Sequence, residues 1–246
     1  MTTRHGKRHA DARAKVDRER EYTPAEAVAL VKSLSGAKFD ESVELHVRTG
    51  LNVRHADEQL RGTIALPNGL GKDVKIAVFA RGPKADEATA AGADVVGAED
   101  LAKQIEEGFM DFDVAIATPD MMPIVGRLGR ILGPSGKMPN PKVGTVTMDV
   151  AKAVEESKSG KVEYRTDRTA IVHLNIGKTS FEEKALLENY AAVIEELIRA
   201  KPSAAKGRYL RTVTIASTMG PGIKVDPSRT RDILGLESGE TAAAAA

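Results

Sequence analysis

Two changes in the spacing of apolar residues limit the folds that this chain can adopt. Between residues 42 and 48, apolar and polar side chains alternate, which is typical of a strand with one face in water. Residues 74–80 are almost continuously apolar, which is typical of a strand buried on both faces. The alternation returns after Gly160. Two kinds of sheet are therefore expected, with the first kind on both sides of the second.

In the middle block, apolar strands alternate with helices. Strands are expected at 74–80, 94–96 and 114–117, with helices between them and another helix at 150–157. Strands of this kind form a parallel sheet with helices on both faces. We therefore expect a three-layer α/β domain over residues 68–159.

The residues on either side, 1–67 and 160–246, are expected to form one discontinuous α+β domain. Its first helix should follow Thr23, because Thr23, Pro24 and Glu26 have the spacing of a capping box with proline in the first turn. Further elements are expected after the middle block: two strands at 161–165 and 170–176 joined as a hairpin, a helix that begins at Ser180, and a strand at 209–217.

The two ends of the chain differ from these segments. The first twenty residues contain seven Lys or Arg and three acids, and we expect a basic arm that is mobile or becomes ordered on a partner; a solvated charged tail is the alternative. The alanine-rich end after Gly239 is expected to be disordered.

One segment, residues 121–148, contains five Gly, four Pro and four basic residues but no acid. It predicts a shaped cationic loop that contacts a polyanion, although a long connection that avoids acids is an alternative. The segment lacks the glycine and the Ser or Thr that a Walker-type phosphate loop requires. Its basic residues form a candidate secondary site: Arg127, Arg130, Lys137 and Lys142.

Charge separates the two expected domains. The whole chain has a formal net charge of +1, but residues 68–159 contain 11 Lys or Arg and 14 Asp or Glu, so the rest of the chain is positive. The discontinuous domain is therefore the better candidate for binding a polyanion. Aromatic residues make up 4% of the chain and Trp is absent, which favours recognition of a folded RNA by shape, phosphate and ribose contacts.

Catalysis, cofactors and metals are not expected. The chain has no Cys, its five His lack metal-ligand spacing, and no serine lies in a nucleophile elbow. No apolar segment is long enough to span a membrane and no signal sequence is recognisable, so a cytoplasmic protein is expected. Two other functions remain open: a nucleotide-dependent α/β enzyme that uses the cationic loop, and a protein-interaction module that uses the basic arm.

Several motifs together carry a resemblance to a known family. They are Tyr22-Thr23, the Lys38–Ser42 segment, Arg61-Gly62-Thr63, the loop from Gly126 to Val146, and Thr218-Met219-Gly220-Pro221. With these motifs the chain closely resembles the family of bacterial large-subunit ribosomal protein one (L-one), which lies in the mobile stalk beside the exit site for transfer RNA.

The resemblance implies a discontinuous split β-α-β sandwich domain, interrupted by a Rossmann-like α/β domain. It also implies that the first domain binds the ribosomal RNA of the stalk. The family usually has Thr in place of Ser42 and often Ser in place of Thr212, and either hydroxyl can make the same hydrogen bond. The residues that the resemblance assigns to RNA binding are Lys38, Phe39, Ser42, Arg54, Arg165, Asp167, Thr212, Thr218, Met219 and Gly220.

The resemblance further implies three RNA partners: stalk ribosomal RNA, exit-site transfer RNA, and the messenger RNA of the protein's own operon, whose translation the family represses. The second domain would swing on two hinges near residues 66–69 and 157–160 as deacylated transfer RNA leaves. No cofactor, metal or membrane is implied, and the protein would be a monomer when it is not on the ribosome.

Overall fold

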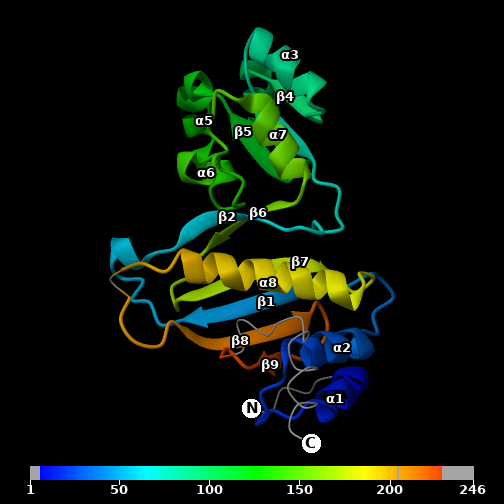
Figure 1. Cartoon of the computed structure of the whole chain (residues 1–246). Helices are drawn as coiled ribbons and strands as arrows, with labels where there is room; N and C mark the ends of the chain where they lie inside the picture. The colour runs from blue at the N-terminus through cyan, green and yellow to red at the C-terminus, as the bar shows by residue number, and fades with distance from the viewer. Residues whose placement is uncertain (1–5, 204, 229–246) are drawn as a thin grey trace, which may run out of the picture. The chain divides into compact units, whose positions relative to one another are not determined.

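The structure is a computed structural model that describes residues 6–203 and 205–228. The expectation of a disordered tail after Gly239 lies outside these residues. The chain divides into two compact units, the first made of residues 1–71 and 164–246 and the second of residues 72–163 (Figure 1). Both units combine helices with sheets, so the mixed α/β and α+β class expected from the sequence is confirmed.

The first unit contains a four-stranded antiparallel sheet with the order β7-β1-β8-β9. Its strands are β1 (Ser42–Thr49), β7 (Ile171–Lys178), β8 (Leu210–Ser217) and β9 (Ile223–Val225). The alternation that predicts β1 is seen in its burial, because every second residue from Val43 is buried. β1 lies between β7 and β8, so the sheet is completed only by strands from the far end of the chain.

Helices α2 (Pro24–Leu34) and α8 (Glu183–Arg199) lie on one face of this sheet (Figure 1). The capping box predicted at Thr23 is confirmed, because its hydroxyl accepts from Glu26 N and the Glu26 carboxylate accepts from Thr23 N. In the basic arm, residues Lys7–Ala14 form helix α1.

The hairpin predicted around residues 166–168 is confirmed only at its turn, where Thr166 and Val172 form a single antiparallel bridge. Strand β6 (Lys161–Arg165) pairs with β2 (Arg61–Ala65) in a separate two-stranded sheet, whereas β7 pairs with β1. The chain turns sharply between β6 and β7, where Asp167 N donates to Ile171 O and Ala170 has a φ of 61°. Each strand therefore finds a partner far away in the sequence.

The predicted start of the long helix, at Ser180, is wrong. Helix α8 begins at Glu183, because both the backbone N–H and the hydroxyl of Ser180 donate to the carboxylate of Asp40, at 3.1 and 2.8 Å. Ser180 is thus used to tie the start of β1 to the end of β7 and does not cap the helix.

The second unit contains a parallel sheet with the order β4-β3-β5, as the sequence predicts. Helices cover both faces of the sheet and bury a separate apolar cluster on each face. The strands are β3 (Ile76–Phe79), β4 (Val95–Gly97) and β5 (Val114–Ala117), and the principal helices are α3 (Pro83–Ala90), α4 (Glu99–Glu106) and α7 (Val150–Lys158).

The segment expected to be a long cationic loop contains several short helices. They are η2 (Pro119–Met121), α5 (Met122–Arg127), α6 (Gly129–Leu132) and η3 (Pro141–Val143). Met121, Val125, Leu128 and Leu132 have helical spacing, and all four are buried in the core of the second unit. Across the described part of the chain, no helix combines the length and apolar character that a membrane span needs.

Candidate nucleic-acid interface

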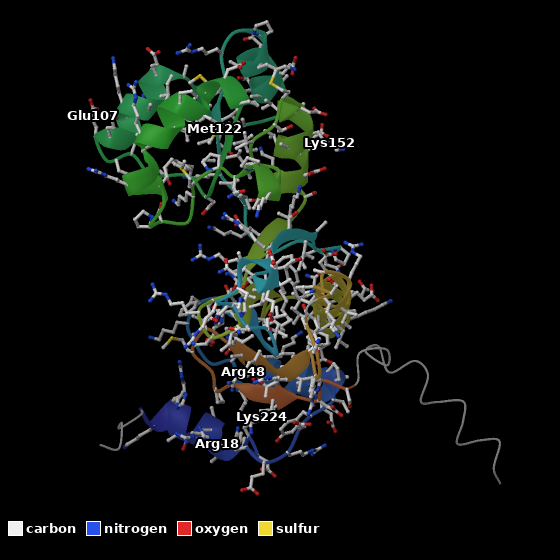
Figure 2. The ribbon with its side chains drawn as sticks, turned by 90° about the vertical axis from the view of Figure 1, so that its left-hand side faces the viewer. Arg18, Arg48, Glu107, Met122, Lys152 and Lys224 are labelled. Atoms are coloured by element: carbon white, nitrogen blue, oxygen red, sulfur yellow. The ribbon has the colours of Figure 1, made fainter. Side chains whose placement is uncertain are left out.

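The face of the four-stranded sheet opposite α2 and α8 carries polar side chains that are exposed or half-buried. Residues directly opposite each other in an antiparallel pair share a face, so these side chains form one continuous surface, which we call the open face. Arg48 and Lys224 are two of its cations (Figure 2). Its members are Glu44, His46, Arg48, His173, Asn175, Thr212, Thr214 and Lys224.

At one end of the open face, a buried carboxylate joins two loops. Glu41 is 1% exposed, and its Oε1 accepts from Gly36 N and Ala37 N at 3.1 and 2.9 Å. Its Oε2 accepts from Met219 N at 3.0 Å. Burial alone would raise the pKa of Glu41, but the N–H groups of Met219, Ala37 and Gly36 hold the pKa below its usual value. Glu41 therefore stays ionised and fixes both loops.

The same end brings together Ser42 and Thr218, which the sequence places 176 positions apart. Ser42 N donates to Thr218 Oγ1 at 3.0 Å, and Thr218 N donates to Ser42 O at 3.0 Å. Lys178 Nζ donates to Ser42 Oγ at 3.0 Å, which adds a cation that sequence reasoning did not include. The two hydroxyls are thus positioned by protein contacts at the edge of the open face.

Two large apolar side chains on these loops are exposed. The exposed fraction is 56% for Phe39 and 53% for Met219, and Lys38 is also exposed. Gly220 follows Met219 where there is no space for a side chain, because a Cβ built there would collide with Ser217 Oγ. Six of the expected site residues therefore share this end, which we call the Phe39 end: Lys38, Phe39, Ser42, Thr218, Met219 and Gly220.

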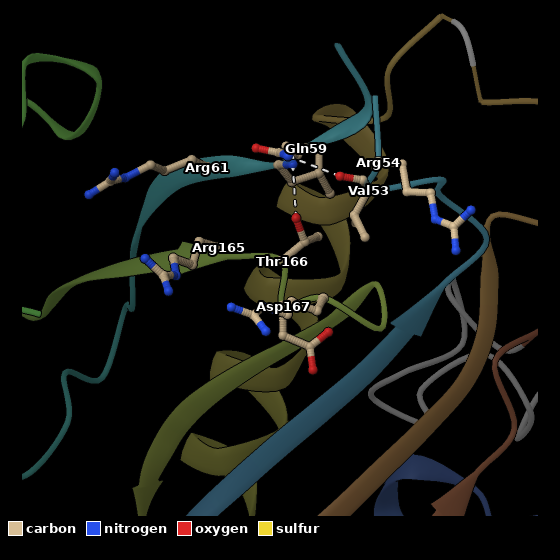
Figure 3. A pocket seen from close by; sticks show the side chains of 9 residues that line it. Val53, Arg54, Gln59, Arg61, Arg165, Thr166 and Asp167 are labelled. Atoms are coloured by element: carbon tan, nitrogen blue, oxygen red, sulfur yellow. Dashed lines mark hydrogen bonds between the residues drawn. The ribbon is translucent and has the colours of Figure 1, made fainter. Parts of the chain in front are cut away.

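The other expected residues lie at the opposite end. Arg54, Arg165 and Asp167 line one pocket of about 510 Å³ (Figure 3), and Thr212 lies opposite Arg48 on the open face. Asp167 is already engaged, because its Oδ1 accepts from Thr169 N and Ile171 N at 2.8 and 2.7 Å.

The pKa of Asp167 follows from these contacts. Burial opposes ionisation, but the N–H groups of Ile171 and Thr169, the Thr169 hydroxyl and His173 outweigh it and lower the pKa to about 2. Asp167 is therefore an ionised group that holds the turn between β6 and β7, whatever else it contacts.

The cationic loop belongs to the second unit, and its four basic residues are not equivalent. Lys137 Nζ donates to Met110 O at 3.0 Å and to Phe112 O, and it lies 5.0 Å from the centre of the Phe112 ring. Arg127, Arg130 and Lys142 are exposed. The ammonium of Lys137 is therefore used inside the unit, and three cations remain at the surface.

Sequence reasoning did not select several residues of this interface. Glu41 gives no local signal, because Met219, which it contacts, lies 178 positions away. His46 and His173 fall within the strands expected at 42–48 and 170–176, but their pairing depends on the register of β1 with β7. The described residues contain no cluster of three or more His, Cys, Asp or Glu that could hold a metal.

Comparison with known proteins identifies a family for this chain. Residues 31–221 match the ribosomal protein L1p/L10e family. The large ribosomal subunit protein uL1 of Rubrobacter xylanophilus is 61% identical over 228 residues, which are 92% of this chain and 99% of that protein. The large ribosomal subunit protein uL1 of Thermobifida fusca is 58% identical over 226 residues, 92% of this chain and 96% of that protein.

Proposed function

The chain belongs to the ribosomal protein L1p/L10e family, and from this membership we propose that its first unit binds the stalk ribosomal RNA of the large subunit through the open face and both of its ends. It is a structural constituent of the large ribosomal subunit and not an enzyme. The RNA contacts are those of a protein that recognises a folded RNA by its backbone and shape.

The observation that carries this proposal is the Phe39 end. Phe39 and Met219 expose apolar side chains that no core contact requires, on two loops joined by the buried Glu41. Exposed apolar groups held in place in this way suit sugar and base faces, while Lys38 and Lys178 beside them suit phosphates. The loops are ordered before the RNA arrives, so binding loses little conformational entropy there.

The open face adds groups that bind backbone rather than bases. Thr212 and Thr214 offer hydroxyls to ribose 2′-OH groups and phosphates, and Arg48 and Lys224 offer cations. Because this face is the surface of a regular sheet, it can follow a rigid RNA stem over several nucleotides.

Two further roles belong to the same proposal. A messenger RNA segment that folds like the stalk would occupy the same surface, and the protein would then repress translation of its own operon. Exit-site transfer RNA would contact the second unit through Arg127, Arg130 and Lys142, which assists its release. The resemblance described above supports both roles, and the exposure of the three cations is compatible with the second.

Binding of the full chain to a folded stalk fragment of large-subunit ribosomal RNA tests the main proposal. We would measure it over a salt series with an unrelated RNA duplex as competitor. Tight binding that survives excess competitor is expected, because shape and sugar contacts persist when phosphate attraction is screened. Weak binding that any duplex removes, and that falls steeply with salt, would contradict the proposal.

A further inference from the structure

The pocket at the end of the open face opposite the Phe39 end brings together four arginines from three segments of the chain. Arg54 follows β1, Arg61 lies on β2, Arg165 ends β6, and Arg168 lies in the turn after it. Figure 3 shows Arg61 and Arg165 on neighbouring strands and Arg54 on the facing segment. The fold places these cations around one pocket, although the repulsion between like charges is unfavourable for the free energy of folding.

Three of these four cations, those of Arg54, Arg165 and Arg168, are not neutralised by any other residue that the structure describes. Over residues 6–203 and 205–228, the guanidinium groups of Arg54, Arg165 and Arg168 make no hydrogen bond or ion pair. The one carboxylate of the pocket, Asp167, is held by Thr169 and Ile171. Three guanidinium groups are therefore available to anions, and the planar fork of an arginine side chain matches the oxygens of a phosphate.

The floor of the pocket has a different character. It includes Leu60, which is 7% exposed, and the half-buried Val53. Two internal hydrogen bonds fix the floor: Gln59 Nε2 donates to Val53 O at 2.9 Å, and Leu60 N donates to Thr166 Oγ1 at 3.2 Å (Figure 3). A phosphate gains nothing from contact with an apolar floor, whereas the flat face of a base can pack against it.

From these observations we propose that the pocket holds one unpaired nucleotide of the bound RNA, with its base on the Val53 and Leu60 floor and its phosphates at the arginine rim. The volume of about 510 Å³ lies within the range of about 300–1,000 Å³ that is usual for small-molecule pockets. This inference rests on the proposed function, since the nucleotide belongs to the RNA that the open face binds.

The role of the pocket follows from its place. A stem on the open face is recognised mainly by its backbone, which carries little sequence information. A pocket at one end that accepts a nucleotide projecting from the stem selects RNAs with an unpaired residue at the right distance. Unpaired nucleotides cost the least free energy to take out of a stack.

Adenosine 5′-monophosphate and ribose 5-phosphate separate the base from the phosphate. We would titrate the full chain with each while observing the methyl signals of Val53 and Leu60 by NMR. AMP is expected to shift both signals saturably, with a Kd on the order of 1 mM because a single nucleotide makes few contacts. Ribose 5-phosphate should leave the methyl signals close to their free positions. Equal effects of the two compounds, or no effect of AMP, would overturn the proposal.

Two variants sharpen the test. Val53→Phe fills the pocket without a change of charge and should abolish the AMP response. Arg168→Gln, at an exposed turn position, should weaken AMP binding several-fold, whereas Lys184→Gln on α8 removes a cation from the other side of the sheet and should not. If Val53→Phe fails to fold, the comparison of Arg168→Gln with Lys184→Gln decides the question. Equal AMP affinity in these two variants would contradict the proposed pocket.

The failure of this inference differs from the failure of the proposed function. Stalk RNA that binds a protein whose pocket ignores AMP leaves the function standing and removes the nucleotide pocket. AMP binding by a protein that does not recognise stalk RNA removes the proposed function and leaves a pocket that binds a nucleotide.

Discussion

His46 and His173 meet across β1 and β7 with their Nδ1 atoms 2.9 Å apart and their ring centres 5.0 Å apart. Each Nε2 faces a carboxylate at 3.6 Å, that of Glu44 for His46 and that of Asp167 for His173. An Nδ1 contact of this kind requires one donor and one acceptor, so the pair holds together with at least one ring neutral. The four side chains are thus linked in the order Glu44, His46, His173, Asp167.

This pair makes the stability of the first unit depend on pH. Burial and the neighbouring His173 lower the pKa of His46, whereas Glu44 opposes the shift. Because the unfolded chain then binds the proton more readily, the stabilisation is complete above the usual histidine pKa of about 6.5 and is lost as the pH falls below it.

The measurement is the free energy of unfolding in urea at several pH values, followed by tyrosine fluorescence. All four tyrosines lie in the first unit, so the signal reports that unit alone. His46→Gln should flatten the pH dependence between about pH 8 and pH 5.5, whereas His55→Gln should leave it as it is. An unchanged slope in His46→Gln would refute this account.

Met219→Ala should weaken the binding of stalk RNA about tenfold, because full burial of a methionine side chain contributes about 1.5–3 kcal/mol and the RNA would cover the exposed half of this one. Met148 is a matched control, since it is 54% exposed and lies in the second unit. Met148→Ala and Arg130→Ala should each have a smaller effect, measured by titration of labelled RNA at constant salt. A larger loss from Arg130→Ala would move the principal site to the second unit.

Glu41→Gln should destabilise the first unit by about 2–3 kcal/mol at neutral pH, because the new NH2 group would face N–H donors and leave buried groups unsatisfied. The folded protein lowers the pKa of Glu41, so its contribution is present above the usual carboxyl pKa and is lost as the pH falls through the folded value. Urea unfolding at pH values from neutral to acid would show the difference between the two proteins shrinking. Equal stabilities at neutral pH would exclude the role given to this carboxylate.

Gly220→Ala should destabilise the first unit by about 1 kcal/mol even without RNA, because the added Cβ meets Ser217 Oγ. Ser217→Ala removes that oxygen, and the double variant should recover the loss. Urea unfolding followed by tyrosine fluorescence gives the free energy of unfolding of Gly220→Ala, Ser217→Ala and the double variant. If the double variant is no more stable than Gly220→Ala, the collision is not the cause.

Lys137→Met should loosen the second unit by about 1–2 kcal/mol, since the carbonyls of Met110 and Phe112 lose their donor. Amide hydrogen exchange of the residues around β5, followed by mass spectrometry, would detect faster opening. Lys142→Met at an exposed position should not change exchange there. The affinity for stalk RNA should be the same in wild type and Lys137→Met.

Elements with a local cause are predictable from the sequence. The capping box at Thr23 fixes the start of α2, and the alternation from residue 42 fixes β1 and its faces. Pairing across the chain is not local: β6 joins β2, and Ser180 bonds to Asp40 instead of capping α8. Strand β9, at Ile223–Val225, is too short for a periodic signal.

Some residues of the candidate site could be predicted from the sequence, and others only from the fold. Phe39 and Met219 are assigned through motifs that a resemblance can recognise, and the structure places them on neighbouring loops. The four arginines of the pocket are spread over more than one hundred positions, and the resemblance assigns only Arg54 and Arg165 of them to RNA binding. Lys137 shows the opposite case, because composition counts it with the surface cations while its ammonium serves the core.

The position of β1 between β7 and β8 determines when the first unit can fold during synthesis. Val47 lies opposite Val172 and Val213, which leave the ribosome only after the whole second unit has been made. At about 5–20 residues per second, the apolar side of β1 waits roughly 6–25 s for its first neighbouring strand. The part of the chain that is translated first is therefore completed last, and the inserted unit can be folded before the unit that contains it.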